Sequence, residues 1–447
     1  MLSDHLVSDL ERVPDHLLYG RITGVLGMMA EIGGIGRALS VGDRVTMIAR
    51  GDRRVPAEIV GFKGDKALAM PFGTLDGIGL GNRVEATGGQ PVLYPHHSWL
   101  GRVIDAMGNP LDGGPPLISG PIGYALRASP PPAHQRRRVQ GKLDLGVKAL
   151  NTFLTCCMGQ RMGIFAGSGV GKSVLLSMIA RGTSADVSVV GLVGERGREV
   201  QDFLHDDLGP EGLARSVVVV ATSDQPPLMR KLAAHTTMTV AEYFRDQNRQ
   251  VLCMIDSVTR FAMAQREIGL SVGEPPASKG YTPTVFAELP RLLERAGPGT
   301  GRQGNITGLF TVLVEGDDMN EPVADAVRGI LDGHIVLERA IAERGRYPAV
   351  NILRSISRTM PGCNNPDENR IVLQARSLIA AYEDMAEMIR LGAYRRGSDA
   401  RTDEVIHYYP MLDAFLSQGK DERTSLAEGY QTLAEILGRA PQAKAAE

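Results

Sequence analysis

The residues with the clearest chemical potential lie between 165 and 174, where the chain reads Phe165-Ala-Gly-Ser-Gly-Val-Gly-Lys-Ser-Val174. Three glycines at alternate positions permit positive φ and let backbone N–H groups approach phosphate oxygens. Lys172 can place an ammonium group on the β- and γ-phosphates, and the hydroxyl of Ser173 is a ligand for Mg²⁺. The pattern predicts a phosphate-binding loop whose ATP-binding residues are Ala166, Gly167, Ser168, Gly169, Val170, Gly171, Lys172, Ser173 and Val174.

The first position of this loop is Ala166, where the strict phosphate-loop pattern has glycine. One extra methyl group is tolerable at the end of a strand. A chance glycine-rich turn is the alternative, and the Gly-Lys-Ser ending between a strand-like and a helix-like run argues against it. We therefore keep the prediction of a nucleotide site.

Two other apolar runs end in acidic residues that could act on the same nucleotide. Val251-Leu-Cys-Met-Ile-Asp256 is typical of a buried strand followed by a Mg²⁺-holding carboxylate, although Asp256 could also cap the next helix. Glu195 could polarise the attacking water and Arg196 could contact the γ-phosphate, unless the two form a solvated surface pair. Glu199, one helical turn further, could order a Mg²⁺-bound water, but an exposed helical glutamate fits its position nearly as well.

A scaffold that brings strand ends together is predicted by the central part of the chain. Continuous apolar runs alternate there with helical patterns, which is typical of parallel strands buried on both faces. The carboxyl ends of such strands share one edge of the sheet, where ligands gather. We predict a doubly wound α/β nucleotide domain over residues 95–370, with strand-like runs at 162–166, 187–193, 216–221, 251–255 and 309–314.

The regions on either side of this domain have other periodicities. Residues 19–94 alternate short β-rich runs with Gly, Asp and Asn turns, which favours a small barrel or sandwich. Residues 371–447 return to helical spacing and predict a helical domain. Between them, the basic run at residues 136–138 could meet nucleic acid or a neighbouring subunit, but a solvated loop is the simpler interpretation.

The composition limits the functional classes. The 447 residues have a formal net charge of −2, so a general electrostatic attraction to nucleic acid is not indicated. The acidic N-terminus does not resemble a signal peptide and no apolar run approaches the length of a membrane span, which predicts a cytosolic protein. The cysteines lack metal-binding or disulfide-framework spacing, and we interpret them as small core residues: Cys156, Cys157, Cys253 and Cys363.

These motifs, together with Asp105-Ala-Met-Gly-Asn-Pro-Leu-Asp112 and Pro348-Ala-Val-Asn-Ile-Leu-Arg-Ser-Ile-Ser357, resemble the rotary ATPase family of ATP-synthase α and β chains and type III secretion ATPases. The resemblance extends over residues 20–437. It implies an N-terminal β-barrel, a central RecA-like doubly wound parallel sheet with a phosphate loop, and a C-terminal helical domain. It also implies assembly as a homo-hexameric ring.

The same resemblance assigns roles to individual residues. It makes Glu195 the catalytic carboxylate, Arg196 a γ-phosphate ligand and Tyr347 an aromatic platform for adenine. Arg358 matches the arginine finger that enters the next subunit's site, where a planar guanidinium can stabilise developing phosphate charge. A structural loop cation is the alternative for Arg358. The implied metal set is Ser173, Asp256 and Glu199.

Within the family, the segments at residues 194–200, 274–281 and 314–325 resemble the type III export ATPases, and the flagellar branch most. That branch implies Mg²⁺-dependent ATP hydrolysis that releases export substrates from chaperones and delivers them to a gate at the inner membrane, by a cytoplasmic enzyme peripherally associated with that apparatus. Asn351 and Thr359 depart from the usual residues of the branch. A virulence secretion ATPase is therefore the main alternative.

Other ring proteins fit the sequence less well. A Rho-like RNA translocase would need stacking aromatics and basic residues in its N-terminal domain, and Tyr19, Phe62 and Phe72 are too sparse. An ATP-synthase catalytic subunit matches the branch-specific segments less closely. A non-catalytic ring subunit would usually lack a carboxylate at the position of Glu195.

Residues 1–18 precede the predicted barrel as a separate segment. Leu2, Leu6, Leu10 and Val13 fall at near-helical spacing and could form one apolar stripe. In export ATPases the corresponding segment binds a stator-like regulator, so the resemblance implies the same partner here. A frayed terminus is the alternative.

Overall fold

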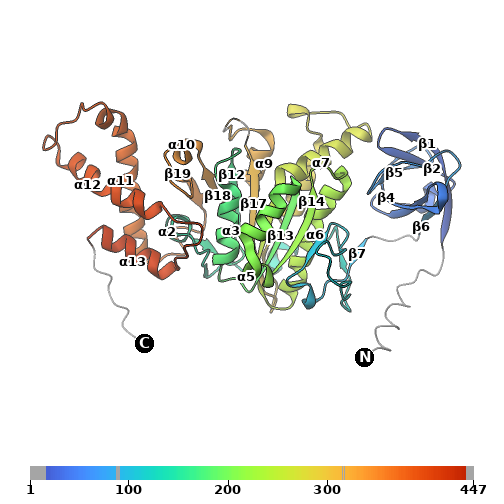
Figure 1. The fold of residues 1–447 in the computed structure, drawn as a ribbon, viewed down its shortest axis with the longest axis horizontal. Coiled ribbons are helices and arrows are strands. Elements are labelled where there is room, and N and C mark those ends of the chain that lie inside the picture. The colour runs from blue at the N-terminus through green and yellow to red at the C-terminus, as the bar shows by residue number, and fades with distance from the viewer. Residues whose placement is uncertain (1–16, 87–90, 315, 317, 439–447) are drawn as a thin grey trace.

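The computed structural model describes residues 17–86, 91–314, 316 and 318–438, which form three bodies in a row (Figure 1). The N-terminal barrel lies at one end, the central sheet with its helices in the middle, and the C-terminal helices at the other end. No helix in these described ranges is long and apolar enough to cross a membrane. The predicted partner-binding stripe at residues 2–13 lies outside the described residues.

The turn-rich N-terminal region closes into a barrel, which resolves the choice between barrel and sandwich. Its strands are hydrogen-bonded in the order β1-β2-β5-β4-β3-β6 and then back to β1, with every pairing antiparallel. Closure removes free sheet edges and buries one side chain in two, as Val45 and Met47 illustrate. The strands are β1 (Leu18–Leu26), β2 (Met29–Gly33), β3 (Arg44–Ile48), β4 (Arg54–Lys63), β5 (Lys66–Pro71) and β6 (Arg83–Ala86).

The continuous apolar runs of the middle region form a nine-stranded sheet. Its order is β19-β18-β12-β17-β15-β13-β14-β8, with β16 paired to β17 outside this path. The neighbours from β18 to β8 are parallel, whereas β19 and β16 are antiparallel to their partners. The strands are β8 (Val103–Asp105), β12 (Arg161–Ala166), β13 (Val187–Glu195), β14 (Ser216–Thr222), β15 (Gln250–Asp256), β16 (Gly297–Pro298), β17 (Asn305–Leu313), β18 (Gly333–Leu337) and β19 (Val350–Ser357).

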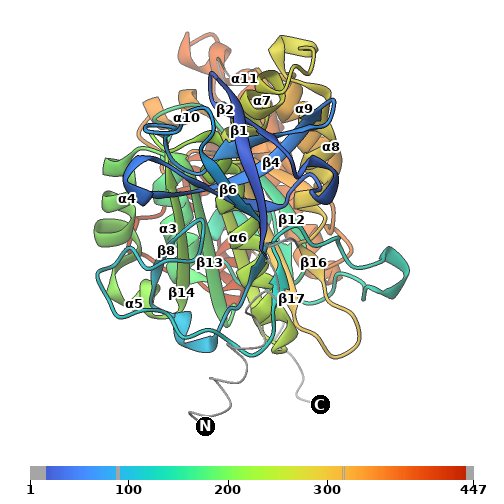
Figure 2. The same ribbon diagram turned by 90° about the vertical axis from the view of Figure 1, so that its right-hand side faces the viewer.

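Helices cover both faces of this sheet, as the double burial of its strands predicts (Figure 2). Along β13, Val189 and Val193 pack with α6, α7, α8 and α9, while Val190 and Leu192 pack with α2 and α3 on the other face. The helices of this region are α2 (Lys148–Phe153), α3 (Lys172–Gly182), α4 (Gly197–Asp202), α5 (Gly209–Ala214), α6 (Pro227–Asp246), α7 (Val258–Ser271), α8 (Pro283–Leu293), α9 (Pro322–Ile330) and α10 (Arg339–Glu343).

Shorter elements join these layers. A π-helical turn, η5 (Phe203–Leu208), connects α4 to α5. Two small antiparallel pairs lie beside the main sheet, β7 (Val92–Leu93) with β9 (Tyr124–Ala125) and β10 (Lys142–Leu143) with β11 (Cys156–Cys157). The 3₁₀ turns are η1 (Gly36–Ala38), η2 (Arg50–Asp52), η3 (His97–Trp99), η4 (Ala133–Gln135) and η6 (Ser278–Gly280).

The C-terminal region is helical, consisting of α11 (Pro366–Arg390), α12 (Ala400–Leu416) and α13 (Leu426–Ile436). Helix α11 begins at Pro366 because Asn365 and Glu368 form a capping box there. The boundary at 370/371 drawn from the sequence therefore falls inside this helix. Apolar residues of all three helices join the core shared by α2 and α3, so the helical region packs directly on the nucleotide domain.

The interpretations of the basic run and of the cysteines were each right only in part. The basic run is not simply a solvated loop, because Arg136 donates to the carbonyl of Ala296 at 2.8 Å and Arg137 donates to that of Gly304 at 3.1 Å. The guanidinium groups of Arg136 and Arg137 thus anchor this loop to the segments on either side of β16. Of the four cysteines, three are buried as predicted, but Cys363 is only half-buried and is not a core residue.

Candidate nucleotide site

The predicted phosphate loop connects the end of β12 to the first turn of α3. Gly169 and Gly171 have φ of +77° and +88°, a region that glycine occupies without strain. Helix α3 begins at Lys172, so its free N–H groups and the positive end of its dipole face the loop. The methyl group of Ala166 is buried at the strand end, so the departure from the strict loop pattern is accommodated inside the core.

Lys172 lies between two carboxylates from other strand ends. Its Nζ is 3.3 Å from Oε1 of Glu195, the last residue of β13, and it forms an ion pair with Asp256, the last residue of β15. All three side chains are almost fully withdrawn from solvent, with 11%, 11% and 4% of their side-chain surfaces exposed. The parallel sheet therefore brings together three residues that are far apart in the sequence.

Burial changes the proton affinities in this cluster. Desolvation, followed by the charge of Asp256, raises the pKa of Glu195 from 4.5 to about 7 despite the opposing effect of Lys172. Desolvation favours neutral Lys172, but the charges of Asp256 and Glu195 outweigh it and raise the pKa of the ammonium. A permanent cation thus lies beside a carboxylate that can exchange a proton near neutral pH, a combination suited to phosphate binding and water activation.

Asp256 is held by a residue that the sequence analysis did not single out. Thr311 on β17 donates its hydroxyl hydrogen to Oδ1 of Asp256 at 2.6 Å, and Thr311 is fully buried. A hydroxyl in the otherwise apolar run at residues 309–314 was the available signal, since a buried hydroxyl needs a partner. The alternative role of Asp256 as a helix cap was wrong, because Ser257 caps α7 by accepting from the N–H of Arg260.

The oxygen ligands near the loop fit a hard divalent cation. Ser173 follows Lys172 in the first turn of α3, and Asp256 supplies a carboxylate at the facing strand end. Within the ranges described, no cluster of three or more His, Cys, Asp or Glu residues could hold a metal unaided. Mg²⁺ typically takes one or two carboxylates, waters and substrate phosphates, so this sparse oxygen set suits it.

Arg196 and Glu199 lie at the start of α4, at the exposed margin of this cluster. Arg196, at the start of α4, has 78% of its side chain exposed and lies 3.5 Å from Glu199. Glu199 is also close enough to Glu195 to share a hydrogen bond that helps to raise the pKa of Glu195. The alternative of a solvated pair between Glu195 and Arg196 is not what forms, because Arg196 pairs with Glu199 and Glu195 is buried.

Tyr347 lies beside the phosphate loop, although it follows Gly171 by 176 positions in the sequence. A Cβ atom on Gly171 would come within 3.3 Å of its ring, and 46% of Tyr347 is exposed. The N–H of Gln418 in the C-terminal region donates to the carbonyl of Tyr347 at 2.8 Å. The position provides an open aromatic face next to the loop, as an adenine platform requires.

Arg358 lies on the opposite edge of the sheet from the phosphate loop. Strand β19 runs antiparallel to β18, so its last residue, Ser357, pairs with the first residue of β18, Gly333. The N–H of Arg358 donates to the carbonyl of Asp332 at 2.9 Å, and Asp332 also binds Arg161 at the start of β12. The six-residue strand β12 separates that edge from the loop by about 17 Å. The Arg358 side chain thus lies too far from Lys172 to share a nucleotide within one chain.

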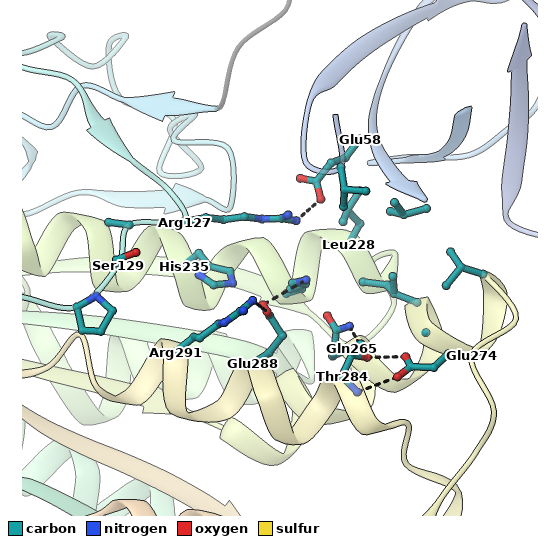
Figure 3. Close-up of a pocket in the computed structure, with 18 residues that line it drawn as sticks. Glu58, Arg127, Ser129, Leu228, His235, Gln265, Glu274, Thr284, Glu288 and Arg291 are labelled. Carbon is teal, nitrogen blue, oxygen red and sulfur yellow. Dashed lines mark hydrogen bonds and ion pairs between the residues drawn. The ribbon is translucent and has the colours of Figure 1, made fainter. Parts of the chain in front are cut away.

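A cavity away from the phosphate loop lies between the barrel and helices α6, α7 and α8 (Figure 3). It has a volume of about 530 Å³. Its charged groups are already paired: Glu58 with Arg127, Glu288 with Arg291, and Glu274 with the hydroxyl and N–H of Thr284. None of the predicted site residues lines it, so we interpret it as part of the joint between barrel and sheet.

Comparisons with known proteins agree with this geometry. Three family models match the chain: the ATP synthase alpha/beta family beta-barrel domain at residues 22–88, the nucleotide-binding domain of the same family at residues 146–357, and the T3SS EscN ATPase C-terminal domain at residues 365–435. The matched segments coincide with the barrel, the phosphate-loop sheet and the C-terminal helices.

Individual proteins resemble the chain over nearly its whole length. A flagellum-specific ATP synthase of Caulobacter vibrioides is 56% identical, covering 97% of this chain and 98% of the relative. A type 3 secretion system ATPase of Xanthomonas euvesicatoria is 45% identical, covering 94% of this chain and 93% of that relative. The solved structure of the assembled ATPase EscN of the enteropathogenic E. coli type III secretion system has a TM-score of 0.88 and 39% identity, covering 94% of this chain and 100% of that one. With its phosphate loop and the carboxylates facing it, the chain belongs to the ATP synthase alpha/beta family.

Proposed function

We propose that this chain is a Mg²⁺-dependent ATPase that energises flagellar protein export through a type III secretion apparatus. The observation that carries the proposal is the placement of Lys172 between Glu195 and Asp256 at the mouth of the phosphate loop. Resemblance to flagellum-specific ATP synthases over almost the full chain supports the flagellar role.

In the proposed mechanism, each residue near the phosphate loop has its own role. Lys172 neutralises phosphate charge, and Glu195 orients the attacking water and accepts its proton, for which a pKa near 7 is suitable. Ser173 and Asp256 would hold Mg²⁺, and Glu199 would order a water bound to the ion. When bound, Mg²⁺ supplies positive charge to the β- and γ-phosphate oxygens. Tyr347 stacks on the adenine ring.

A second copy of the chain completes the site in this proposal. Arg358 cannot reach the nucleotide of its own chain, because β19 carries it to the far edge of the sheet. The proposed working form is a homo-hexameric ring in which Arg358, with Arg196 of the site it enters, stabilises the γ-phosphoryl charge. The related EscN was solved as an assembled ATPase.

The remaining partners follow from the flagellar role. We propose that the segment at residues 1–18 binds a stator-like regulator, and that the ring receives export substrates and their chaperones and delivers them to the export gate. The enzyme would then be cytoplasmic and peripherally associated with the inner membrane. EscN has been solved together with its central stalk EscO, which supports binding of a further protein to a ring of this kind.

A virulence secretion ATPase is the second candidate. Two observations favour it: the 45% identity to a type 3 secretion system ATPase and the match of residues 365–435 to the EscN C-terminal domain. The catalytic chemistry would be the same and only the cargo would differ.

Two measurements test the proposal. First, ATPase activity per subunit should rise with protein concentration as the ring forms, and Lys172→Ala should abolish it; activity in that variant would contradict the assigned site. Second, the gene should restore hook-protein export and swimming to a bacterium that lacks its own flagellar ATPase, whereas the Lys172→Ala gene should not. Restoration of effector secretion alone, in a strain lacking its virulence ATPase, would favour the second candidate.

A further inference from the structure

The phosphate loop is contacted from outside by the segment at residues 339–347. Helix α10 begins at Arg339, and Nη2 of this arginine donates to the main-chain carbonyl of Ser168 at 2.9 Å. Further along the same segment, the ring of Tyr347 lies against Gly171. One short segment thus contacts the loop at two points, near its middle and at its end.

The bond to Arg339 sets the orientation of one peptide group. In a trans peptide the C=O and the N–H point to opposite sides of the chain, so a carbonyl of Ser168 that faces Arg339 leaves the N–H of Gly169 facing away from it. Among the residues that the structure describes, none accepts from that N–H. Both loop residues are exposed, and glycine permits many backbone conformations. The guanidinium therefore supplies a restraint that the glycine-rich backbone lacks.

The residue before Arg339 is anchored to strand β19. The N–H of Glu338 donates to the carbonyl of Ala349 at 2.9 Å. The Glu338 carboxylate accepts from Nδ2 of Asn351 through Oε2, and its Oε1 lies 3.8 Å from Nη1 of Arg354. The start of α10, and with it the position of Arg339, is thus fixed by both the backbone and the side chain of Glu338.

This contact explains the residue type at position 351, one of the departures from the usual residues of the export branch. Oδ1 of Asn351 accepts from the N–H groups of Leu353 and Arg354 at 3.0 Å, which orients the amide so that its Nδ2 faces Glu338. An aspartate could accept the same two bonds, but it would place a second carboxylate against that of Glu338. Asn351 is only 7% exposed, so water would screen that repulsion poorly. Glu338 and Asn351 are therefore a matched pair.

We propose that Arg339 is a positioning residue of the nucleotide site. Its guanidinium fixes the peptide between Ser168 and Gly169 so that the N–H of Gly169 faces the phosphates of the nucleotide. The Glu338–Asn351 pair fixes the start of α10 and thereby the place of Arg339. This role rests on the proposed ATPase function, to which it adds a residue that acts through the loop backbone.

Loss of this restraint should weaken the binding of any polyphosphate, with or without a base. We expect Arg339→Ala to raise the Kd of both an imido-bridged ATP analogue and tripolyphosphate roughly tenfold, as for the loss of one hydrogen bond to a charged donor. The value of kcat should stay nearly unchanged, because the bond is the same before and during the reaction. Tyr347→Ala, in contrast, removes an adenine contact and should leave the Kd of tripolyphosphate unchanged.

The test uses the full-length chain with Mg²⁺. A fluorescent ADP analogue is bound to the protein and displaced with the imido-bridged ATP analogue or with tripolyphosphate, and steady-state ATPase assays on the same preparations give KM and kcat. Arg344→Ala is the matched control, because Arg344 is exposed at the other end of α10. It should bind both ligands like the natural chain.

Variants of the matched pair test how Arg339 is held. Asn351→Asp should raise the Kd of both ligands about threefold, a modest coupling for residues in contact. Adding Glu338→Gln to Asn351→Asp should restore the affinity, since the amide of glutamine can donate to the new carboxylate. Glu338→Gln alone keeps an acceptor for Asn351 and should change little. Additive effects, or tighter binding by Glu338→Gln alone, would mean that net charge near the loop controls affinity and would overturn the role of the pair.

The outcomes separate this proposal from the proposed function. A natural chain that neither binds these ligands nor hydrolyses ATP refutes the function. A natural chain that does both, with unchanged Kd values in Arg339→Ala, refutes only the positioning role. A fall in kcat at unchanged Kd, or a loss of affinity for the ATP analogue but not for tripolyphosphate, would also contradict it, because Arg339 would then act on the reaction or on the adenine side instead of on the loop.

Discussion

The two halves of the candidate site differ in burial and in the contacts that their side chains make within one chain. The inner half, Lys172, Glu195 and Asp256, is buried at the carboxyl ends of strands in one sheet, and its members are bonded to each other. The outer half, Arg196, Tyr347 and Arg358, is exposed and its side chains make few contacts. A single chain thus holds the inner half, which would bind phosphate, in a fixed arrangement. The outer half, which would enclose the nucleotide, would gain its contacts only from a bound ligand or from a second chain.

This difference has a physical reason. Parallel strands converge at one edge, so residues at their ends meet without any further device. Arg358 is at the end of the antiparallel strand β19, and the same sheet therefore carries it to the other edge. An exposed guanidinium is hydrated, so it has no desolvation cost when no partner is present. A buried carboxylate does have that cost, and it needs a cation beside it in the folded chain.

The variant with the largest expected effect is Arg358→Ala, in the outer half. If Arg358 acts across a boundary between chains, its loss should reduce kcat by about 10³-fold, the usual contribution of an arginine finger, with little change in nucleotide affinity. ATPase assays at a concentration where the ring forms measure the effect. Arg370→Ala, at an exposed position of α11 where Arg370 pairs with Asp367, is the matched control and should keep full activity.

Rings mixed from two variants test whether Arg358 acts on the site of a neighbouring chain. Arg358→Ala subunits retain an intact inner half, and Lys172→Ala subunits retain an intact finger. Mixed rings should regain part of the activity that each variant alone lacks, because some boundaries combine both intact parts. Failure of every mixing ratio to restore activity would place Arg358 outside the nucleotide site.

Glu195→Gln tests the inner half, where the expected loss is about 10²–10³-fold in kcat if Glu195 accepts a proton. Because burial raises the pKa of Glu195 to about 7, the reactive carboxylate forms as the pH rises through neutrality. Activity of the natural chain should therefore increase between pH 6 and pH 8, while the residual activity of the variant should be nearly flat. Parallel, equally steep profiles would contradict the role of Glu195.

The sequence predicted where Lys172, Glu195 and Asp256 lie in the fold, because the signals for their positions are local. The glycine spacing before Lys172 and the acids that end two apolar runs identified the strand ends, and the barrel and the helical C-terminal region followed from periodicity. Strand order is not local: the contact of Lys172 with Asp256 depends on β12, β17 and β15 being neighbours, and the place of Arg358 depends on β19 being antiparallel.

Contacts across long sequence distances account for the remaining errors and omissions. Arg136 was interpreted as solvated because the carbonyl that it binds is 160 residues away. Cys363 was interpreted as a core residue from its type alone, whereas the fold leaves it half-buried with its Sγ donating to Oδ1 of Asn364 at 3.4 Å. Thr311 was passed over inside an apolar run. In each case the residue type was visible in the sequence, but its partner was visible only in the fold.

Tyr347 offers a smaller test on the outer half. Stacking of an aromatic ring on a base contributes about 1–3 kcal/mol, so Tyr347→Ala should raise the KM for ATP roughly tenfold and change kcat little. Tyr347→Phe keeps the ring beside Gly171 and should be close to the natural chain. Equal increases in both variants would show that the hydroxyl, not the aromatic face, is what matters.

The smallest expected effect belongs to Thr311, which supports the inner half without facing the nucleotide. Thr311→Val keeps the shape of the side chain and removes only the hydrogen bond to Asp256. Lys172 still neutralises that carboxylate, so we expect a loss of about 1 kcal/mol in transition-state stabilisation, roughly fivefold in kcat. A Mg²⁺ titration of ATPase activity should show the same carboxylate binding the ion more weakly. Thr311→Ser restores the hydroxyl and should recover the activity; if it does not, packing against Asp256 rather than the hydrogen bond positions this side of the site.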